Sequence, residues 1–246
     1  MSVLVVTGTD TGVGKTVVAA ALTTLALARG APAAMVKPAQ TGTDPDAAGD
    51  VDQVIRLSGV TTTFELRRFA DPLSPAAAAR AAGVPPVSLE EAARLVRELA
   101  GCHRLVVVEG TGGLLERFDE DGATIADLAR SLGAQVLVVA GTGAGAVNHA
   151  ALTLEALAHR GLEPAGLVIG RWPGVPGPVA RSCVADLEML AARPLAGALP
   201  DGAGRLGGQA FAEVARTGLS ASLGGAFDAA EFRRRLRLPP PGAGWG

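Results

Sequence analysis

The sequence has 246 residues, of which 48% are hydrophobic and 19% charged, which predicts a packed α/β core and excludes a disordered chain. The formal net charge of −2 leaves no basic footprint for nucleic acid, and no apolar run is long enough to cross a bilayer. Cys102 and Cys183 have no metal-type spacing and the N-terminus lacks a secretory signal, so we expect a cytoplasmic protein without membrane or nucleic-acid partners.

The chain begins with a predicted strand, a glycine-rich turn and a helix. The strand is VLVV (3–6), the turn is GTDTGVGKT (8–16), and the helix runs from Lys15 to Arg29. Successive backbone N–H groups in such a turn, together with the N-terminus of the helix, form a cradle for phosphate oxygens. This order indicates a phosphate-binding loop rather than a plain strand–turn–helix junction.

Four residues of the turn have a defined chemistry. Gly12 and Gly14 let the backbone approach a phosphate without a clash from a Cβ atom. Lys15 can reach the β- and γ-phosphates, and the Thr16 hydroxyl can ligate Mg²⁺. The turn therefore predicts a site for a nucleoside triphosphate and magnesium.

The start of the turn departs from the strict P-loop pattern. Thr9 stands where that pattern has a glycine, as in the deviant loops of partition-type ATPases. Those loops carry a second lysine five positions before the P-loop lysine, and here that position is Asp10. We interpret the turn as a deviant loop outside the motor-like branch.

The second predicted strand, AAMV (33–36), leads into polar residues at its C-terminal end. Lys37 stands at this end, Pro38 is expected to end regular pairing, and Gln40 and Thr41 add polar groups. A single lysine is commonly solvated, but a transferring phosphoryl group needs cationic stabilisation. Since ligands bind at this edge of α/β sheets, Lys37 is a candidate catalytic residue.

Three aspartates follow in DAAGDVDQVIRL (46–57). One of Asp46, Asp50 and Asp52 is expected to cap the following helix. One can supply another oxygen to Mg²⁺, and spacing alone does not choose between them.

A third buried strand, RLVVVE (104–109), ends in a carboxylate before a glycine-rich turn. Glu109 at this position suits a Walker-B-like role, holding Mg²⁺ directly or through water. Gly110, Gly112 and Gly113 allow a second backbone cradle.

Three further strands are predicted from apolar runs at 135–140, 166–170 and 194–199. Helices are predicted after Ser88, which caps LEEAARLVRELA, and from Asn148 to Gly161. Strand–helix alternation predicts a single α/β domain (1–237) with a mostly parallel sheet and helices on both faces. The Pro- and Gly-rich tail (238–246) is predicted to be disordered.

The glycine-rich lead-in to the helix near Asn148 can serve as an anion site. Its N–H groups and the positive end of the helix dipole suit a carboxylate or a phosphate, and Asn148 can also cap the helix. His149 is expected to be a structural surface residue.

Six segments together resemble the dethiobiotin synthetase family, ATP-dependent enzymes of biotin synthesis with a P-loop NTPase-like fold. They are GTDTGVGKT (8–16), KPAQTG (37–42), PLSPAAAA (72–79), EGTGGLL (109–115), NHAALTLEAL (148–157) and GALP (197–200). The chain after about Asp201 adds little to the resemblance.

The resemblance implies a homodimer whose two active sites lie at the subunit interface. One amine of 7,8-diaminononanoate would capture CO₂ as a carbamate, and a carbamate oxygen would attack the γ-phosphate of ATP. The second amine would then close on the carbamic–phosphoric anhydride and release phosphate. Such chemistry needs phosphate neutralisation and positioning more than acid–base groups.

The resemblance also implies a role for each matching residue. Lys15 and Lys37 would stabilise the carbamate and the phosphoryl group, and the Mg²⁺ set would be Thr16, Asp50 and Glu109. Substrate contacts would be Thr11, Lys37, Thr41 and, from the other subunit, Gly143, Ala144, Gly145, Ala146, Val147 and Asn148. Nucleotide contacts would be Thr11, Gly12, Val13, Gly14, Lys15, Thr16, Val17, Glu109, Gly110, Gly112, Gly113, Gly170, Arg171 and Pro200.

The sequence departs from the family at one nucleotide-binding position. Many members carry Asn-Arg after the fifth strand, where the Asn reads the adenine edge, whereas this chain has Gly170 and Arg171. Because glycine has no side chain, we predict looser nucleobase selectivity, with Trp172 as a candidate to pack near the base.

Two other functions fit the sequence less well. An amide synthetase of the cobyrinate type needs a C-terminal glutaminase domain with a nucleophilic cysteine, but the chain ends at 246 and Cys183 has no Gly-rich elbow. A partition-type regulatory ATPase is disfavoured by Asp10 and by the lack of a basic amphipathic tail. We therefore favour the cyclo-ligase.

Overall fold

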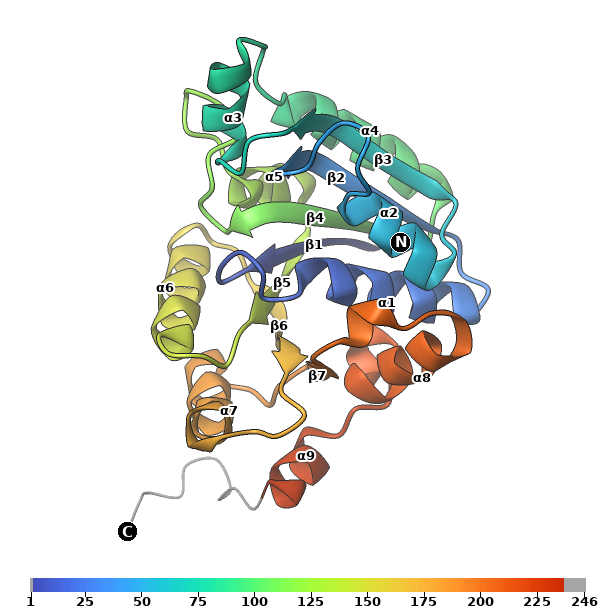
Figure 1. The fold of residues 1–246 in the computed structure, drawn as a ribbon, viewed down its shortest axis with the longest axis vertical. Helices are drawn as coiled ribbons and strands as arrows, with labels where there is room; N and C mark the ends of the chain where they lie inside the picture. The colour runs from blue at the N-terminus through green and yellow to red at the C-terminus, as the bar shows by residue number, and fades with distance from the viewer. Residues whose placement is uncertain (1, 237–246) are drawn as a thin grey trace.

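In the computed structural model, which describes residues 2–236, seven strands form one sheet with helices on both faces (Figure 1). The strand order is β3-β2-β4-β1-β5-β6-β7, and each neighbouring pair is parallel. The predicted α/β class with a parallel sheet is confirmed. The predicted tail (238–246) lies outside the described residues, and the domain boundary at residue 237 stays a prediction.

The strands are β1 (Ser2–Gly8), β2 (Ala33–Thr41), β3 (Thr62–Phe69), β4 (Leu105–Gly113), β5 (Gln135–Ala140), β6 (Pro164–Trp172) and β7 (Gly197–Pro200). The α-helices are α1 (Lys15–Ala28), α2 (Asp50–Ser58), α3 (Pro75–Ala82), α4 (Leu89–Cys102), α5 (Ile125–Leu132), α6 (Ala146–His159), α7 (Pro178–Ala191), α8 (Gly208–Gly218) and α9 (Ala229–Arg235). Short 3₁₀ helices are η1 (Ala203–Arg205) and η2 (Ala221–Leu223).

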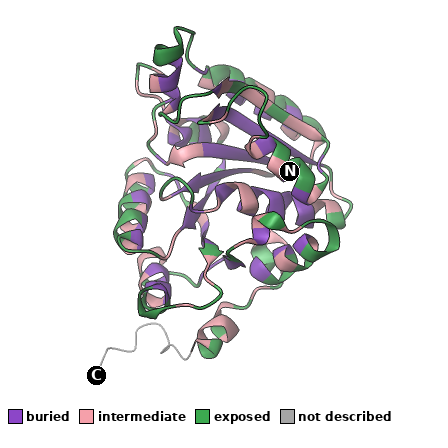
Figure 2. Cartoon of the chain, viewed as in Figure 1, coloured by how far each residue is buried: buried purple, intermediate pink, exposed green. Residues whose placement is uncertain are grey.

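The central strands are mostly buried (Figure 2), and their apolar side chains pack on both faces, so the sequence of these strands is a continuous apolar run. Along β1, Leu4 and Val6 pack into the layer of α1, α2 and α8, whereas Val5 packs on the opposite face with α3, α4 and α5. Side chains alternate between faces with a period of two in a strand. Helices α6 and α7 cover the same face as α4 and α5, over β5 and β6.

Strand β3 was missed by the sequence prediction. It lies at the edge of the sheet and most of its residues are half-buried or exposed. An edge strand needs no continuous apolar run, so the signal that identified the central strands is absent there.

Two predicted strand ends are also wrong. Strand β2 continues beyond Lys37 and Pro38 to Thr41, because it stays paired with β3 after its pairing with β4 ends at Val36. Strand β4 likewise continues through the glycines after Glu109, as far as Gly113. Both extensions carry polar groups to the C-terminal edge of the sheet.

The helix starts differ in how well they were predicted. The Ser88 hydroxyl accepts a hydrogen bond from the Glu91 N–H at 3.1 Å, which confirms it as the cap of α4. Asn148 does not open α6, which begins at Ala146 with Gly145 as its N-cap. Gly145 has φ +81°, a left-handed conformation that glycine adopts without strain, so the helix starts two residues earlier than predicted.

Candidate active site

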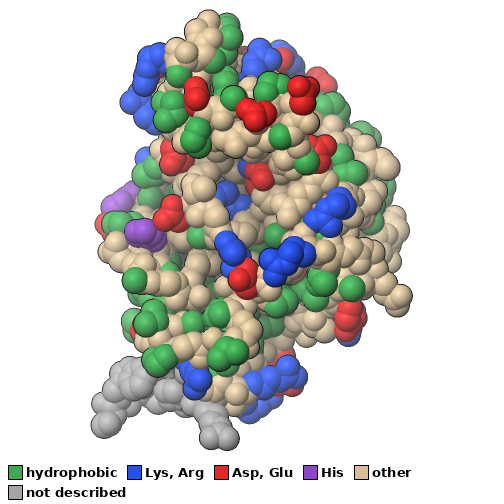
Figure 3. All heavy atoms as spheres, in the orientation of Figure 1, with side chains coloured by type: hydrophobic (Ala, Val, Ile, Leu, Met, Phe, Trp, Pro, Cys, Tyr) green, Lys and Arg blue, Asp and Glu red, His purple; other side chains and the backbone are tan. Residues whose placement is uncertain are grey.

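A cavity of about 670 Å³ lies at the C-terminal edge of the sheet, beside the phosphate loop. Its walls come from the loop between β1 and α1, the C-terminal ends of β2, β4, β6 and β7, the start of α2, and the segments that follow β3 and β7. On the face drawn in Figure 3, basic and acidic side chains are interspersed. The cavity is formed where the strand order reverses around β1, which is where ligands bind in open α/β sheets.

The phosphate loop is held in a conformation that depends on its glycines. Gly12 and Gly14 have φ +74° and +101°, in the left-handed region. The ammonium of Lys15 folds back and donates to the carbonyl oxygen of Asp10 at 3.0 Å. This is the ammonium that the motif predicts on the β- and γ-phosphates.

Lys15 is poised for an anionic ligand. Burial disfavours its charged form and, together with the nearby charge of Lys37, lowers the pKa of Lys15 to about 8. An arriving phosphate supplies negative charge that stabilises the ammonium form.

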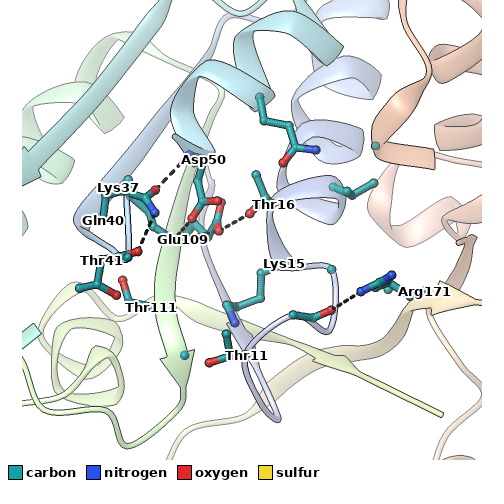
Figure 4. Close-up of a pocket in the computed structure, with 18 of the residues that line it drawn as sticks. Thr11, Lys15, Thr16, Lys37, Gln40, Thr41, Asp50, Glu109, Thr111 and Arg171 are labelled. Carbon is teal, nitrogen blue, oxygen red and sulfur yellow. Dashed lines mark hydrogen bonds and ion pairs between the residues drawn. The ribbon is translucent and has the colours of Figure 1, made fainter. Parts of the chain in front are cut away.

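Lys37 is the centre of a buried ion cluster (Figure 4). Its Nζ lies 2.7 Å from Asp50 Oδ2 and 2.9 Å from Glu109 Oε1, and it donates to the Gly110 carbonyl oxygen at 3.0 Å. The exposed fractions are 2% for Lys37 and 0% for Glu109, against 30% for Asp50. The lysine is therefore not a solvated surface residue but part of a built site.

Burial and charge act against each other on these three groups. Burial would lower the pKa of Lys37, but the carboxylates of Glu109 and Asp50 outweigh it and raise the pKa. Burial would raise the pKa of Asp50, but the Lys37 ammonium holds it below its usual range. For Glu109, burial prevails and raises the pKa despite Lys37.

Glu109 retains unused coordinating capacity. Its Oε1 accepts hydrogen bonds from Lys37 and from the Thr16 hydroxyl, the latter at 2.8 Å. Its Oε2 is buried and has no hydrogen-bond partner within residues 2–236. An orphaned carboxylate oxygen beside a threonine hydroxyl and a second carboxylate is a donor set that fits Mg²⁺.

The aspartates that spacing could not distinguish have separate places. Asp52 Oδ2 accepts the Gly49 N–H at 2.8 Å, so Asp52 holds the start of α2. Asp50, the first residue of α2, turns its carboxylate to Lys37, and its own N–H donates to Gln40 Oε1 at 3.0 Å. Asp46 lies in the exposed loop before them and does not line the cavity.

Most of the predicted site residues line this one cavity. These are Thr11, Gly12, Gly14, Lys15, Thr16, Val17, Lys37, Thr41, Asp50, Glu109, Gly112, Gly170, Arg171 and Pro200. Three predicted nucleotide contacts do not line it. Val13 packs its side chain into the core, Gly110 offers its carbonyl to Lys37, and Gly113 pairs with Gly8 of β1.

The predicted carboxylate site at the start of α6 is apart from the main cavity. Gly143, Ala144 and Ala146 instead line a smaller cavity of about 230 Å³ on the other side of the phosphate loop, while Gly145, Val147 and Asn148 do not line it. His149 also lines the smaller cavity, and its Nδ1 lies 3.5 Å from Asp10 Oδ2. Of the described residues, Thr11, Gly12 and Arg171 belong to both cavities.

The segment after β7, which contributed little to the sequence prediction, forms one wall of the main cavity. Residues 201–205 line it, as do Gln53, Thr111 and Glu116. Arg171 Nε lies 2.9 Å from Asp201 Oδ1, and Arg171 Nη1 donates to the Gly12 carbonyl oxygen at 3.3 Å. The glycines of DGAGR (201–205) were the only local signal for this wall.

Gly170 is required by packing. A Cβ atom at this position would lie 2.2 Å from the Val13 carbonyl oxygen and 2.6 Å from Val139 Cγ1. Trp172 does not line the main cavity, because its ring packs edge-on against Phe232 with centroids 4.9 Å apart. The absence of a side chain at position 170 thus lets the phosphate loop approach β6.

Two kinds of feature are absent from residues 2–236. No helix there is long and apolar enough to cross a membrane. No group of three or more His, Cys, Asp and Glu side chains is arranged to hold a metal by itself. Mg²⁺ commonly binds through one or two carboxylates plus substrate phosphates, so Asp50 and Glu109 remain a suitable pair.

The chain is similar to curated proteins over nearly its whole length. Residues 2–203 match a family model described as an AAA domain. The chain is 59% identical to the ATP-dependent dethiobiotin synthetase BioD of Parafrankia sp., over 97% of this chain and 100% of that protein. Identity is 52% to the same-named protein of Streptomyces coelicolor, over 96% of this chain and 99% of that one. Identity to the same-named protein of Mycobacterium avium is 53%, over 87% of this chain and 93% of that one.

Solved structures with much lower identity share the fold. The ParA family ATPase from Chlorobium tepidum has a TM-score of 0.56 at 14% identity, covering 91% of this chain and 96% of that one. The cell division ATPase MinD of Pyrococcus furiosus has a TM-score of 0.53 at 17% identity, covering 96% of this chain and 100% of that one. The likeness concerns the fold alone and confirms a P-loop NTPase-like fold.

Proposed function

Because the chain belongs to the dethiobiotin synthetase family, we infer that its phosphate-loop cavity carries out the ATP-dependent formation of dethiobiotin in biotin biosynthesis. The protein is a ligase that closes a ring, a cyclo-ligase. The observation that carries this assignment to the cavity is the buried Lys37 cluster beside the phosphate loop. Relatives at 59% and 57% identity favour neither a cobyrinate-type amide synthetase nor a partition-type ATPase.

We propose that the reaction joins 7,8-diaminononanoate, CO₂ (or bicarbonate as its source) and ATP. One amine captures CO₂ as a carbamate, and a carbamate oxygen attacks the γ-phosphorus while ADP leaves. The second amine then attacks the carbamate carbon of the mixed anhydride, and phosphate leaves with the former carbamate oxygen. The product is a cyclic urea.

Lys15 and Lys37 supply the positive charge that this sequence of steps needs. The Lys15 ammonium leaves the Asp10 carbonyl for the phosphate oxygens, an exchange of a neutral acceptor for a charged one that strengthens the hydrogen bond. Lys37, held at the cavity by Asp50 and Glu109, stabilises the carbamate and the transferring phosphoryl group. Neither lysine must move a proton.

Thr16, Asp50 and Glu109 are the residues that would hold Mg²⁺. Mg²⁺ neutralises charge on the β- and γ-phosphates when it is bound. The orphaned Oε2 of Glu109 supports this assignment, because a buried carboxylate oxygen without a partner costs free energy that a cation relieves.

The remaining assignments are proposals of the same kind. Thr11 and Thr41 contact the diamine, and the start of α6 (143–148) binds the substrate carboxylate of the other subunit of a homodimer. The position of that segment outside its own chain's main cavity supports a role across an interface. We place the protein in the cytoplasm, and we expect looser nucleobase selectivity than in family members that have Asn at the position of Gly170.

ATP turnover with and without 7,8-diaminononanoate and bicarbonate tests the function, with dethiobiotin identified by mass. Turnover should depend on both substrates, and Lys37→Ala should lose turnover while it keeps nucleotide binding. ATP hydrolysis at a rate independent of the diamine, or stimulated by DNA, would refute the proposal. Widely different efficiencies with ATP, GTP and CTP would contradict the nucleobase prediction alone.

A further inference from the structure

Arg68, on the edge strand β3, contacts the exposed loop between β2 and α2 (42–49). Its Nη1 donates to three backbone carbonyl oxygens of that loop, those of Asp44 at 3.4 Å, Pro45 at 3.3 Å and Ala47 at 2.5 Å. One guanidinium nitrogen therefore shares its two hydrogens among three carbonyl oxygens within a four-residue stretch of the loop (44–47). Ordering an exposed loop costs about 1–2 kcal/mol per residue in conformational entropy, so contacts of this kind decide whether it has one structure.

The rest of the guanidinium is anchored on the other side. Its Nε and Nη2 donate to the two carboxylate oxygens of Glu65 at 2.6 and 3.0 Å. Its Nη2 also lies 3.6 Å from Asp52 Oδ2. The planar fork of arginine can satisfy a carboxylate and several carbonyls at once, which a lysine ammonium cannot.

A short chain of contacts leads from this anchor to the ion cluster. Asp52 Oδ2 accepts the Gly49 N–H, and the next N–H, that of Asp50, donates to the buried Gln40. The Asp50 carboxylate then lies 2.7 Å from Lys37 Nζ. Arg68 thus contacts the chain on both sides of Asp50, through the Asp52 carboxylate after it and through carbonyl oxygens of the loop before it.

We propose that Arg68 is a positioning residue, which directs the carboxylate of Asp50 toward Lys37 and toward the magnesium that accompanies the nucleotide. The proposal rests on the proposed function only for the identity of that metal. Arg68 itself does not line the cavity, so it acts through the loop and not on the substrate. Groups that orient a metal ligand typically change metal affinity or activity by about 10–100-fold when they are removed.

Three variants and a neighbouring control test this inference. Arg68→Ala removes the anchor, and Arg68→Lys keeps a charge for Glu65 but loses the fork. Gly49→Ala presses on the same anchor from the loop, since its Cβ would lie 2.8 Å from Arg68 Nη2 and 3.3 Å from Gln40 Oε1. Gly49 has φ −101°, which alanine adopts freely, so an effect would come from these contacts with Arg68 and Gln40 and not from backbone strain. The control is Arg67→Ala, because Arg67 is exposed and its guanidinium donates to the carbonyl oxygen of the neighbouring Leu66 at 3.2 Å, away from the loop and from Asp50.

The measurement is the Mg²⁺ concentration that half-saturates binding of a fluorescent ATP analogue, followed by turnover. We expect Arg68→Ala to raise it about 10-fold or more, with a lower kcat and a smaller change in the KM for diamine. Arg68→Lys and Gly49→Ala should shift it in the same direction, and Arg67→Ala should match the wild type. Thermal melting identifies any of the three variants that fails to fold, and the Mg²⁺ dependence of the remaining variants then tests the proposal.

Unchanged Mg²⁺ dependence in the folded variants overturns the proposal, as does wild-type nucleotide binding that ignores Mg²⁺. A shift in Arg67→Ala equal to that in Arg68→Ala overturns it too, since a general weakening of β3 would then explain both. Because nucleotide binding needs no ring closure, a wild-type protein that makes no dethiobiotin refutes the proposed function and leaves this test intact.

Discussion

Replacing Lys37 with methionine removes one buried charge and nearly preserves the length of the side chain. Glu109, which is 0% exposed, loses its ammonium partner in a place that water does not reach. Asp50, which is 30% exposed, can recover water. The variant therefore leaves one uncompensated buried carboxylate, that of Glu109, and not two.

The size of the effect follows from that difference. Removing one partner of a buried ion pair destabilises a protein by about 3–5 kcal/mol. The Thr16 hydroxyl still donates to Glu109 at 2.8 Å, so we expect the lower end, about 3 kcal/mol near pH 7. For a chain of this size that lowers the melting temperature by about 6–12 °C. Turnover should fall about 10²–10³-fold, as when one stabilising donor is removed from an active site.

The loss of stability should depend on pH. Burial already raises the pKa of Glu109 above 4.5 in the wild type, and loss of the Lys37 charge raises it further. The folded variant then binds more protons than the unfolded chain, so its free energy of unfolding decreases as the pH rises above about 4.5. Urea unfolding should show a smaller gap to the wild type at about pH 5 than at about pH 8.

The double variant Lys37→Met/Glu109→Gln separates stability from catalysis. It removes both charges, so it should regain most of the lost stability and stay inactive. A single variant with an equal deficit at both pH values would refute the electrostatic reasoning. Turnover within about threefold of the wild type would refute the catalytic role, since that corresponds to less than 1 kcal/mol of barrier.

Three further predictions follow from buried groups and close contacts. Burial, and next the charge of Lys37, lower the pKa of Lys15 to about 8, so ATP affinity should fall by up to about tenfold per pH unit above that value. Calorimetry should show proton uptake when ATP binds, and an affinity that does not change with pH would contradict the prediction. Gly170→Ala should destabilise the protein by about 1–3 kcal/mol in urea unfolding and weaken nucleotide binding, because the methyl group would overlap the phosphate loop; normal ATP binding argues against the contact. Arg233→Ala should destabilise the protein by about 1–3 kcal/mol and leave turnover unchanged, because the carboxylate of Glu188, which is 3% exposed, loses its ion partner. An unchanged midpoint of urea unfolding would count against that ion pair.

Local sequence was enough for the features that depend on local physics. The strand–turn–helix order around Lys15 identified a phosphate loop, because backbone N–H groups form that cradle within a few residues. The buried strands were found because a parallel sheet covered on both faces requires continuous apolar runs. The family was also identified from short segments, and close relatives bear it out.

The features that were missed depend on distant neighbours. The edge strand β3 carries no apolar run, and only its pairing with β2 reveals it. Asp50 and Asp52 are equally plausible from their positions at the start of α2. Their roles differ only in the fold, where Asp50 pairs with Lys37 and Asp52 accepts the Gly49 N–H. The wall at 201–205 belongs to the cavity because β7 ends beside β6, a fact of strand order that no local pattern records.

By itself, the sequence determined which chemistry this protein performs and which lysines are its candidates. Tertiary structure alone decided how those lysines are charged and held, because burial, ion pairing and close backbone approach arise only when separate strands meet. Lys37 is the plainest case. Seen alone it is one lysine before a proline, whereas in the fold two carboxylates from α2 and β4 keep its ammonium charged in a buried site.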